Sequence, residues 1–159
     1  MTAIAFILQA IIALILIIYL VLRLIQAFGN NRKWKVLEPA LMEGIEKSLG
    51  QKIVFKTLQN ALPSPEADAR QASLLWLAFT AEYVVFVIRD EITEGRGDDV
   101  FMARKRDTSI MRIDRYKAEF EVKNKDTSEV SKLILMVNRS RYELLTQYIP
   151  EKRGNVSRF

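Results

Sequence analysis

The sequence predicts an α+β protein: one N-terminal transmembrane helix followed by a small domain with an antiparallel meander sheet packed by about three helices. Three observations predict this fold. No charged residue occurs in residues 1–22, strict alternation of apolar and polar side chains runs over residues 116–123, and helix start and stop signals lie between the apolar runs. A chain of 159 residues has room for one domain with an appendage.

The N-terminal segment, residues 1–28, has the length and composition of a membrane span. Roughly 20 apolar residues cross a bilayer core of about 30 Å. A signal peptide would have a positive region before a shorter apolar run, and a buried core helix would show a polar face. Residues 1–22 show neither feature, so we expect a transmembrane helix with the lipid bilayer as its partner.

Positive charge follows this span and does not precede it. The expected membrane-interface residues are Arg23, Arg32, Lys33, Trp34 and Lys35. Because the side richer in Lys and Arg stays in the cytoplasm, we expect the N-terminus outside the inner (plasma) membrane and the domain in the cytoplasm. Trp34 fits an aromatic anchor at headgroup depth, and it fits equally well a side chain packed on the following helix.

The predicted organisation has four parts. A transmembrane helix covers residues 1–28, a basic juxtamembrane linker covers 29–36, a cytoplasmic α+β domain covers 37–150, and a loose polar tail covers 151–159.

Within the domain, Pro39 at a first helical position and Gly50 as a stop predict a short helix. A strand is expected over residues 52–58. Ser64, followed by Pro65 and Glu66, is a helix start, and the helix is expected to reach about Phe79.

Residues 83–88 read as a buried strand. The alternative is a second membrane span over residues 73–88, which is short for a bilayer and would bury Glu82.

The second half reads as strands joined by turns. Glycines and charges predict a hairpin turn over residues 94–99, and a further hairpin is expected through Asp107 and Thr108. After a last buried strand over residues 132–138, Ser140 and Glu143 form a capping box for a final helix that Pro150 ends.

The composition removes several kinds of chemistry. The chain has no cysteine and no histidine, which excludes disulfides, thiolate nucleophiles, imidazole bases and the usual zinc sites. The paired carboxylates, Asp90 with Glu91 and Asp98 with Asp99, fall at strand ends or turns. We therefore expect a protein that is not an enzyme and that has no cofactor and no metal site; the alternative is an enzyme acting on lipids or their headgroups.

Basic residues gather in the region of the predicted sheet. The expected anion-binding set is Arg104, Arg106, Arg112, Arg115 and Lys117. The hairpin after Arg106 would bring Arg112 back beside Arg104, and converging guanidinium groups suit phosphates. An anionic small molecule or a lipid headgroup is the expected ligand, and the alternative is a solvated strand face balanced by neighbouring acids. With a net charge of +5 and no recognition-helix pattern, duplex DNA is not expected as a partner.

Three stretches carry a resemblance in outline: "YVVFVIRD", "SIMRIDRYKAEFEV" and "SKLILMVNRSRYELLTQYI". Short meandering strands closed by one C-terminal amphipathic helix resemble the bacterial pleckstrin-homology-like domains. This resemblance implies binding to lipid headgroups or peptides and no catalysis. A single span followed by helices and a curved sheet is also similar to the inner-membrane assembly factors of type IV secretion, which would place the domain outside the cytoplasm.

These observations favour a single-pass, membrane-anchored, non-catalytic cytoplasmic adaptor that acts as a homo-oligomer or with membrane-protein partners. The alternative is a ligand-gated membrane effector. Its cytoplasmic domain would bind a cyclic (oligo)nucleotide or another anionic small molecule, in an architecture similar to the nucleotide-gated effectors of phage defence.

Overall fold

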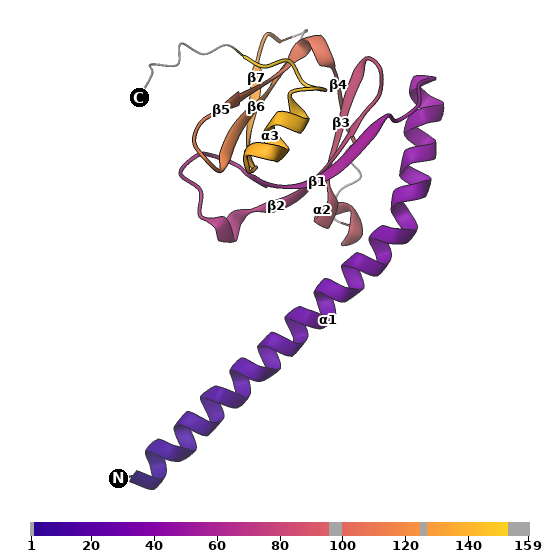
Figure 1. Cartoon of the computed structure of the whole chain (residues 1–159). Helices are drawn as coiled ribbons and strands as arrows, with labels where there is room; N and C mark the ends of the chain where they lie inside the picture. Colours follow the sequence, from indigo (N-terminus) through magenta and orange to yellow (C-terminus); the bar gives the residue numbers. More distant parts are fainter. Residues whose placement is uncertain (1, 96–99, 125–126, 153–159) are drawn as a thin grey trace. The chain divides into compact units, whose positions relative to one another are not determined.

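The computed structural model describes residues 2–95, 100–124 and 127–152, with side chains from residue 12 onward. A long helix, α1 (Thr2–Leu49), precedes a seven-stranded antiparallel sheet with short helices, which confirms the predicted α+β class (Figure 1). The chain divides into two compact units, Met1–Leu41 and Met42–Phe159. The expected turn over residues 94–99 falls largely outside the described residues, as do residues 153–159 of the expected tail.

Helix α1 has 48 residues, and at 1.5 Å per residue it is about 72 Å long. Its apolar side chains from Ile12 to Ile25, and Phe28, are exposed. In the described part of the chain, α1 is the one helix that is long and apolar enough to cross a membrane. A bilayer core of about 30 Å accounts for less than half of that length, so the helix continues well beyond the apolar segment.

Residues 29–36, expected as a basic juxtamembrane linker, are helical and continue α1. Pro39 does not begin a separate helix but lies inside α1. A glycine costs about 1 kcal/mol and a proline about 3 kcal/mol inside a helix, but the good helix formers on both sides extend a helix that is already formed, so Gly29, the two asparagines and Pro39 do not end α1. Gly50 follows the last helical residue with φ of 65°, which confirms it as the stop.

The strands form one sheet in the order β4-β3-β2-β1-β7-β6-β5. Two meanders, β1 to β4 and β5 to β7, are joined by the pairing of β1 with β7, and every pair is antiparallel. The strands are β1 (Phe55–Leu62), β2 (Ser73–Phe79), β3 (Tyr83–Ile88), β4 (Phe101–Arg104), β5 (Thr108–Arg112), β6 (Lys117–Lys123) and β7 (Val130–Met136).

The helix expected from Ser64 to about Phe79 is wrong. The segment contains a single 3-10 turn, η1 (Ala69–Gln71), and then strand β2. The Asp68 carboxylate accepts a hydrogen bond from the main-chain N–H of Arg70 at 3.0 Å and sets up this turn. Strand β2 lies between β1 and β3, and both of its faces are buried after Leu74. Burial on both faces removes the polar–apolar alternation by which a strand is recognised.

The alternative of a second membrane span over residues 73–88 is also excluded, because these residues form the β2–β3 hairpin. Its turn is closed by the N–H of Thr80, which donates to the carbonyl of Tyr83 at 3.0 Å. A short helix, α2 (Arg89–Thr93), follows β3.

The expected hairpin through Asp107 and Thr108 is wrong as well. A 3-10 turn, η2 (Lys105–Asp107), joins β4 to β5, but the two strands do not pair. Strand β4 pairs with β3 and β5 pairs with β6, at opposite ends of the strand order. The turn residues correctly indicated a break between two strands, but they did not indicate which strand each of the two would pair with.

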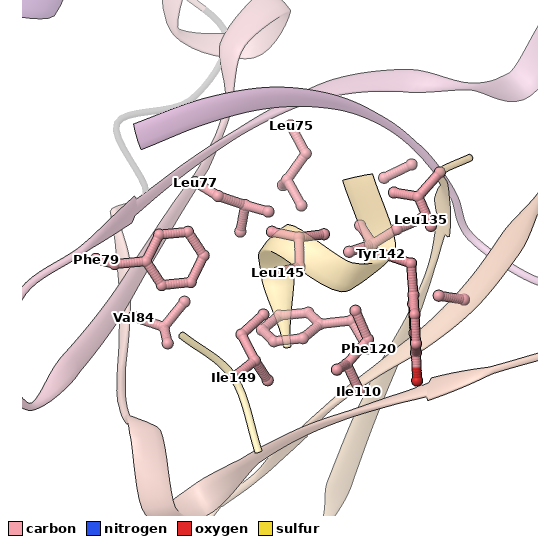
Figure 2. Packing of buried hydrophobic residues seen from close by; sticks show 13 residues of the cluster. Leu75, Leu77, Phe79, Val84, Ile110, Phe120, Leu135, Tyr142, Leu145 and Ile149 are labelled. Atoms are coloured by element: carbon pink, nitrogen blue, oxygen red, sulfur yellow. The ribbon is translucent and has the colours of Figure 1, made fainter. Parts of the chain in front are cut away.

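Helix α3 (Arg139–Leu145) supplies part of the core. Its N-cap is Asn138, whose side-chain oxygen accepts from the N–H of Arg141 at 2.9 Å, so the expected cap at Ser140 is wrong by two residues. Residues of α3 and of the loop after it meet side chains from six strands (Figure 2). The labelled core residues are Leu75, Leu77, Phe79, Val84, Ile110, Phe120, Leu135, Tyr142, Leu145 and Ile149.

Candidate binding groove

The five residues of the expected anion-binding set do not converge. Arg104 ends β4 and Arg106 lies in η2, at the start of β5. Arg112 ends β5, and Arg115 and Lys117 follow it. Strand β5 separates the two groups by on the order of 13 Å. The set therefore forms two groups at opposite ends of one strand.

The second group has local partners. The Arg112 guanidinium donates to the main-chain carbonyls of Asp114 at 3.0 Å and Arg115 at 3.3 Å, and it lies 5.8 Å from the ring centroid of Tyr142. The Lys117 ammonium donates to the carbonyl of Pro65 at 3.0 Å. These two cations hold the β5–β6 turn and the loop before β2 in place.

The expected membrane-interface residues all lie within α1, outside the unit that begins at Met42. The side chains of Arg23, Arg32, Lys33 and Lys35 are exposed, and Trp34 lies between two of them in sequence. Their role at a membrane surface stays a prediction.

A groove of about 750 Å³ lies between strand β4 and the end of the β6–β7 hairpin. Six apolar side chains form its floor, at the margin of the hydrophobic core. Each of them belongs to the core cluster, packs against that cluster, or stacks on a side chain that packs against it. The apolar floor residues are Leu75, Phe86, Ile88, Phe101, Val122 and Leu133. The rings of Phe86 and Phe101 stack with centroids 5.2 Å apart, and this pair extends the apolar surface to the edge of the sheet.

Exposed apolar side chains continue along β4. Phe101 and Met102 are 45% and 49% exposed. The exposed Phe101 ring is continuous with the apolar floor through Phe86, and contiguous exposed apolar surface marks interaction sites more often than single apolar residues do. The groove and β4 therefore form the best candidate site among the described residues.

The rim of the groove is polar and mostly basic. Arg104, Lys123 and Lys132 supply cations, and Asp107 supplies a carboxylate. Lys132 is already paired, since its ammonium lies 3.0 Å from Glu119 and 2.9 Å from Glu121. Arg104 is thus the one member of the expected anion-binding set that lines the groove.

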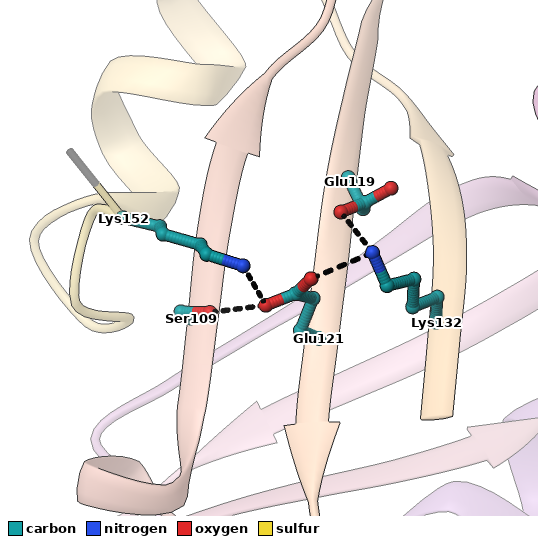
Figure 3. Close-up of polar contacts among 5 residues, drawn as sticks. All are labelled: Ser109, Glu119, Glu121, Lys132 and Lys152. Atoms are coloured by element: carbon teal, nitrogen blue, oxygen red, sulfur yellow. Dashed lines mark hydrogen bonds and ion pairs between the residues drawn. The ribbon is translucent and has the colours of Figure 1, made fainter. Parts of the chain in front are cut away.

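A charged cluster that shares Lys132 with the rim lies on β5, β6, β7 and the segment after α3 (Figure 3). The Glu121 carboxylate accepts from Lys152 at 2.7 Å and from Ser109 at 3.3 Å, and Lys132 lies on its other oxygen. Hydrogen bonds lower the pKa of Glu121 to about 2; the bond from Lys152 contributes most and the bond from Lys132 is second. A carboxylate with this pKa stays ionised near neutral pH, so it fastens strands together and does not act as a proton donor.

The sequence did not reveal the groove. Alternation over residues 117–123 and the apolar run over residues 83–88 showed which strands have apolar faces. It did not show that Phe86 on β3 and Leu133 on β7 line the same groove, because they are 47 positions apart in a chain of 159.

Comparison with protein-family models, with curated proteins and with solved structures found no match. The class of the protein is therefore defined by its own features. In its described residues it has one helix long and apolar enough to span a membrane, followed by an α+β domain with an open apolar groove at one edge of its sheet.

Proposed function

We propose that this protein is a single-pass, membrane-anchored, non-catalytic domain that faces the cytoplasm and docks a partner protein within an oligomeric membrane complex. The observation that carries this proposal is the groove: a floor of six apolar side chains, one of them the exposed Phe101 of the edge strand β4, with the exposed Met102 next to it in sequence. Burying such surface against a partner contributes roughly 25 cal/mol per Å² of apolar area. Exposure of these apolar side chains to water is therefore unfavourable, and a partner that covers them gains this free energy.

The helix supports a partner at the membrane. A domain held by α1 searches the layer of cytoplasm next to the bilayer, where the effective concentration of a membrane-bound partner is high. Weak docking in a groove of this size is then sufficient for assembly.

The charge distribution supports the proposed orientation. Arg32, Lys33 and Lys35 follow the apolar segment, and no Lys or Arg precedes it. Because the chain has no cysteine, single substitutions report topology without background. We expect a membrane-impermeant maleimide on intact cells to label Thr2→Cys and to leave Ser48→Cys unlabelled until the cells are opened. Labelling of Ser48→Cys on intact cells would reverse the orientation.

The ligand-gated alternative has less geometric support. Its basic set is split between the two ends of β5, and Arg112 and Lys117 are engaged with main-chain carbonyls. An anionic small molecule that binds the folded domain would raise its thermal stability, so a thermal-shift measurement detects this alternative directly.

Site-specific photo-crosslinking in living cells tests the docking proposal. A photoreactive phenylalanine at Met102, which is 49% exposed beside the groove, is compared with the same residue at Ile113, which is 43% exposed at the β5–β6 turn. We expect one discrete protein adduct at position 102, lost when Phe101→Asp is added, and no such adduct at position 113.

Equal adducts at both positions, or no protein adduct at position 102, would contradict the proposal. A thermal shift of the full chain with a cyclic dinucleotide, abolished by Arg104→Ala, would favour the ligand-gated alternative instead.

A further inference from the structure

We propose that the occupant of the groove is an extended acidic segment of the partner protein, which adds to the sheet as a new strand alongside β4. This inference rests on the proposed docking function and specifies the chemistry of the partner. It follows from three features of the groove: an open main-chain edge, an apolar floor and a basic rim.

The main-chain edge comes first. The N–H of Lys105 donates to the carbonyl of Glu82 at 2.8 Å, which continues the β3–β4 ladder past Arg104. Hydrogen-bonded and non-hydrogen-bonded pairs alternate in an antiparallel ladder. The main-chain groups of Met102 and Arg104 are therefore directed away from β3. In the described part of the chain, β4 ends the strand order and pairs with β3 alone.

The floor suits a strand. Successive side chains of a strand point to opposite faces, so every second residue of an added strand would point into the groove. Phe101 lines the groove on the β4 side, and Val122 and Leu133 line it on the β6–β7 side. Apolar side chains at alternate positions of the partner segment would cover these residues.

The basic rim favours negative charge on the added strand. Arg104 and Lys123 are exposed and form no ion pair with the residues that the structure describes. Asp107 lies at the η2 end. The two cations favour carboxylates at the remaining positions of the added strand and disfavour Lys and Arg there.

A lipid chain fits the groove less well. It would cover the floor, but it would also bury the outward N–H and C=O groups of Met102 and Arg104 without giving them partners. Each unsatisfied buried group costs about 1–3 kcal/mol. An extended peptide satisfies these groups and covers the floor at the same time.

The test uses the full chain in lipid nanodiscs and a phage-displayed library of random dodecapeptides. We expect selection to enrich peptides with apolar residues at alternate positions and Asp or Glu between them. A synthetic peptide of the enriched pattern is then N-methylated at one residue at a time. Methylation at residues of one parity should weaken binding about tenfold or more, and methylation at the other parity should have little effect. This scan uses the unaltered protein, so folding cannot confound it.

Charge reversal provides the second measurement. Arg104→Glu combined with Lys123→Glu should weaken the acidic peptide about tenfold or more, and a peptide with Lys in place of its acids should recover binding to this variant. Arg115→Glu is the control, since Arg115 is an exposed arginine in the turn after β5, at the end of that strand away from the groove, and its substitution should leave affinity unchanged.

The outcomes separate the two proposals. Strand addition is overturned, and docking is not, by either of two results. One is N-methylation that weakens binding equally at odd and even positions of the peptide; the other is an adduct at Met102 without any enriched peptide. Peptide binding that survives Phe101→Asp shows that the peptide does not use the groove, which also overturns the inference. Absence of both the peptide and the adduct overturns the docking proposal itself.

Discussion

The two edges of the sheet differ in how their main-chain groups are used. At the β5 edge, residues 150–152 pair with the outward main-chain groups of Ile110. The N–H of Ile110 donates to the carbonyl of Pro150, and the N–H of Lys152 donates to the carbonyl of Ile110, both at 2.9 Å. Glu151 forms a parallel bridge with Ile110. At the β4 edge, no described residue pairs with the outward side of the strand.

The apolar surface behind each edge differs in the same way. On the β5 side, α3 and the loop after it bury Tyr142, Leu145 and Ile149 among the strands (Figure 2). On the β4 side, the margin of the same core stays open as the groove. An exposed edge invites pairing with another chain, and proteins usually protect it. Residues 150–152 protect the β5 edge, and the β4 edge is the one that the docking proposal assigns to a partner.

The largest expected effect separates the two sides by stability. Leu145→Ala removes a side chain that is 1% exposed and should lower the free energy of unfolding by about 2–5 kcal/mol. Leu133→Ala at the half-buried groove floor should cost about 1 kcal/mol. Both losses of stability are measured by denaturing the full chain in detergent and monitoring the fluorescence of Trp76 in a Trp34→Phe background. Equal losses would show that the two sides are packed alike.

The next effect tests how the β5 edge is fastened. Glu121→Gln weakens the bonds from Lys152 and Lys132 and should cost about 1–3 kcal/mol. The matched control is Glu143→Gln, because the exposed pair of Glu143 with Arg139 is worth only about 0.3–0.5 kcal/mol. The same denaturation assay measures both variants, and similar small losses would show that the cluster does not fasten this edge.

The Glu121 cluster also predicts a pH dependence. Its pKa is about 2 in the folded protein, below the ordinary value of 4.5. The stability that it contributes is therefore fully present above pH 4.5 and is lost as the pH falls from 4.5 toward 2. Wild type and Glu121→Gln should converge in stability over that window, and a difference that stays constant would contradict the assignment.

The smallest expected effect concerns the polar tip of the buried Tyr142. Its hydroxyl donates to Glu151 at 2.7 Å, so Tyr142→Phe should cost about 0.5–1.5 kcal/mol. Burial, and then the bond to Glu151, raise the pKa of Tyr142 to about 12 from 10.0. This contribution is present below pH 10 and declines as the pH rises toward 12. A cost of Tyr142→Phe that is unchanged between pH 9 and 12 would contradict it.

The sequence predicted those elements whose signals are local. The uncharged run over residues 1–22 predicted the long apolar helix, alternation over residues 116–123 predicted β6, and Gly50 predicted the end of α1. Tails and turns were predicted less well: Glu151 and Lys152, expected in a loose tail, pair with β5. Strand β2 was mistaken for a helix because a strand buried on both faces has no polar side to mark its period.

The sequence by itself determined the class of the molecule: an apolar helix followed by an α+β domain without cysteine or histidine chemistry. Only the tertiary structure decided the site. The order of strands separated Arg104 from Arg112, closed the β5 edge with the C-terminal segment and left β4 open beside the groove. Pairing between strands distant in sequence depends on side-chain packing across the whole sheet, and no local pattern contains that information.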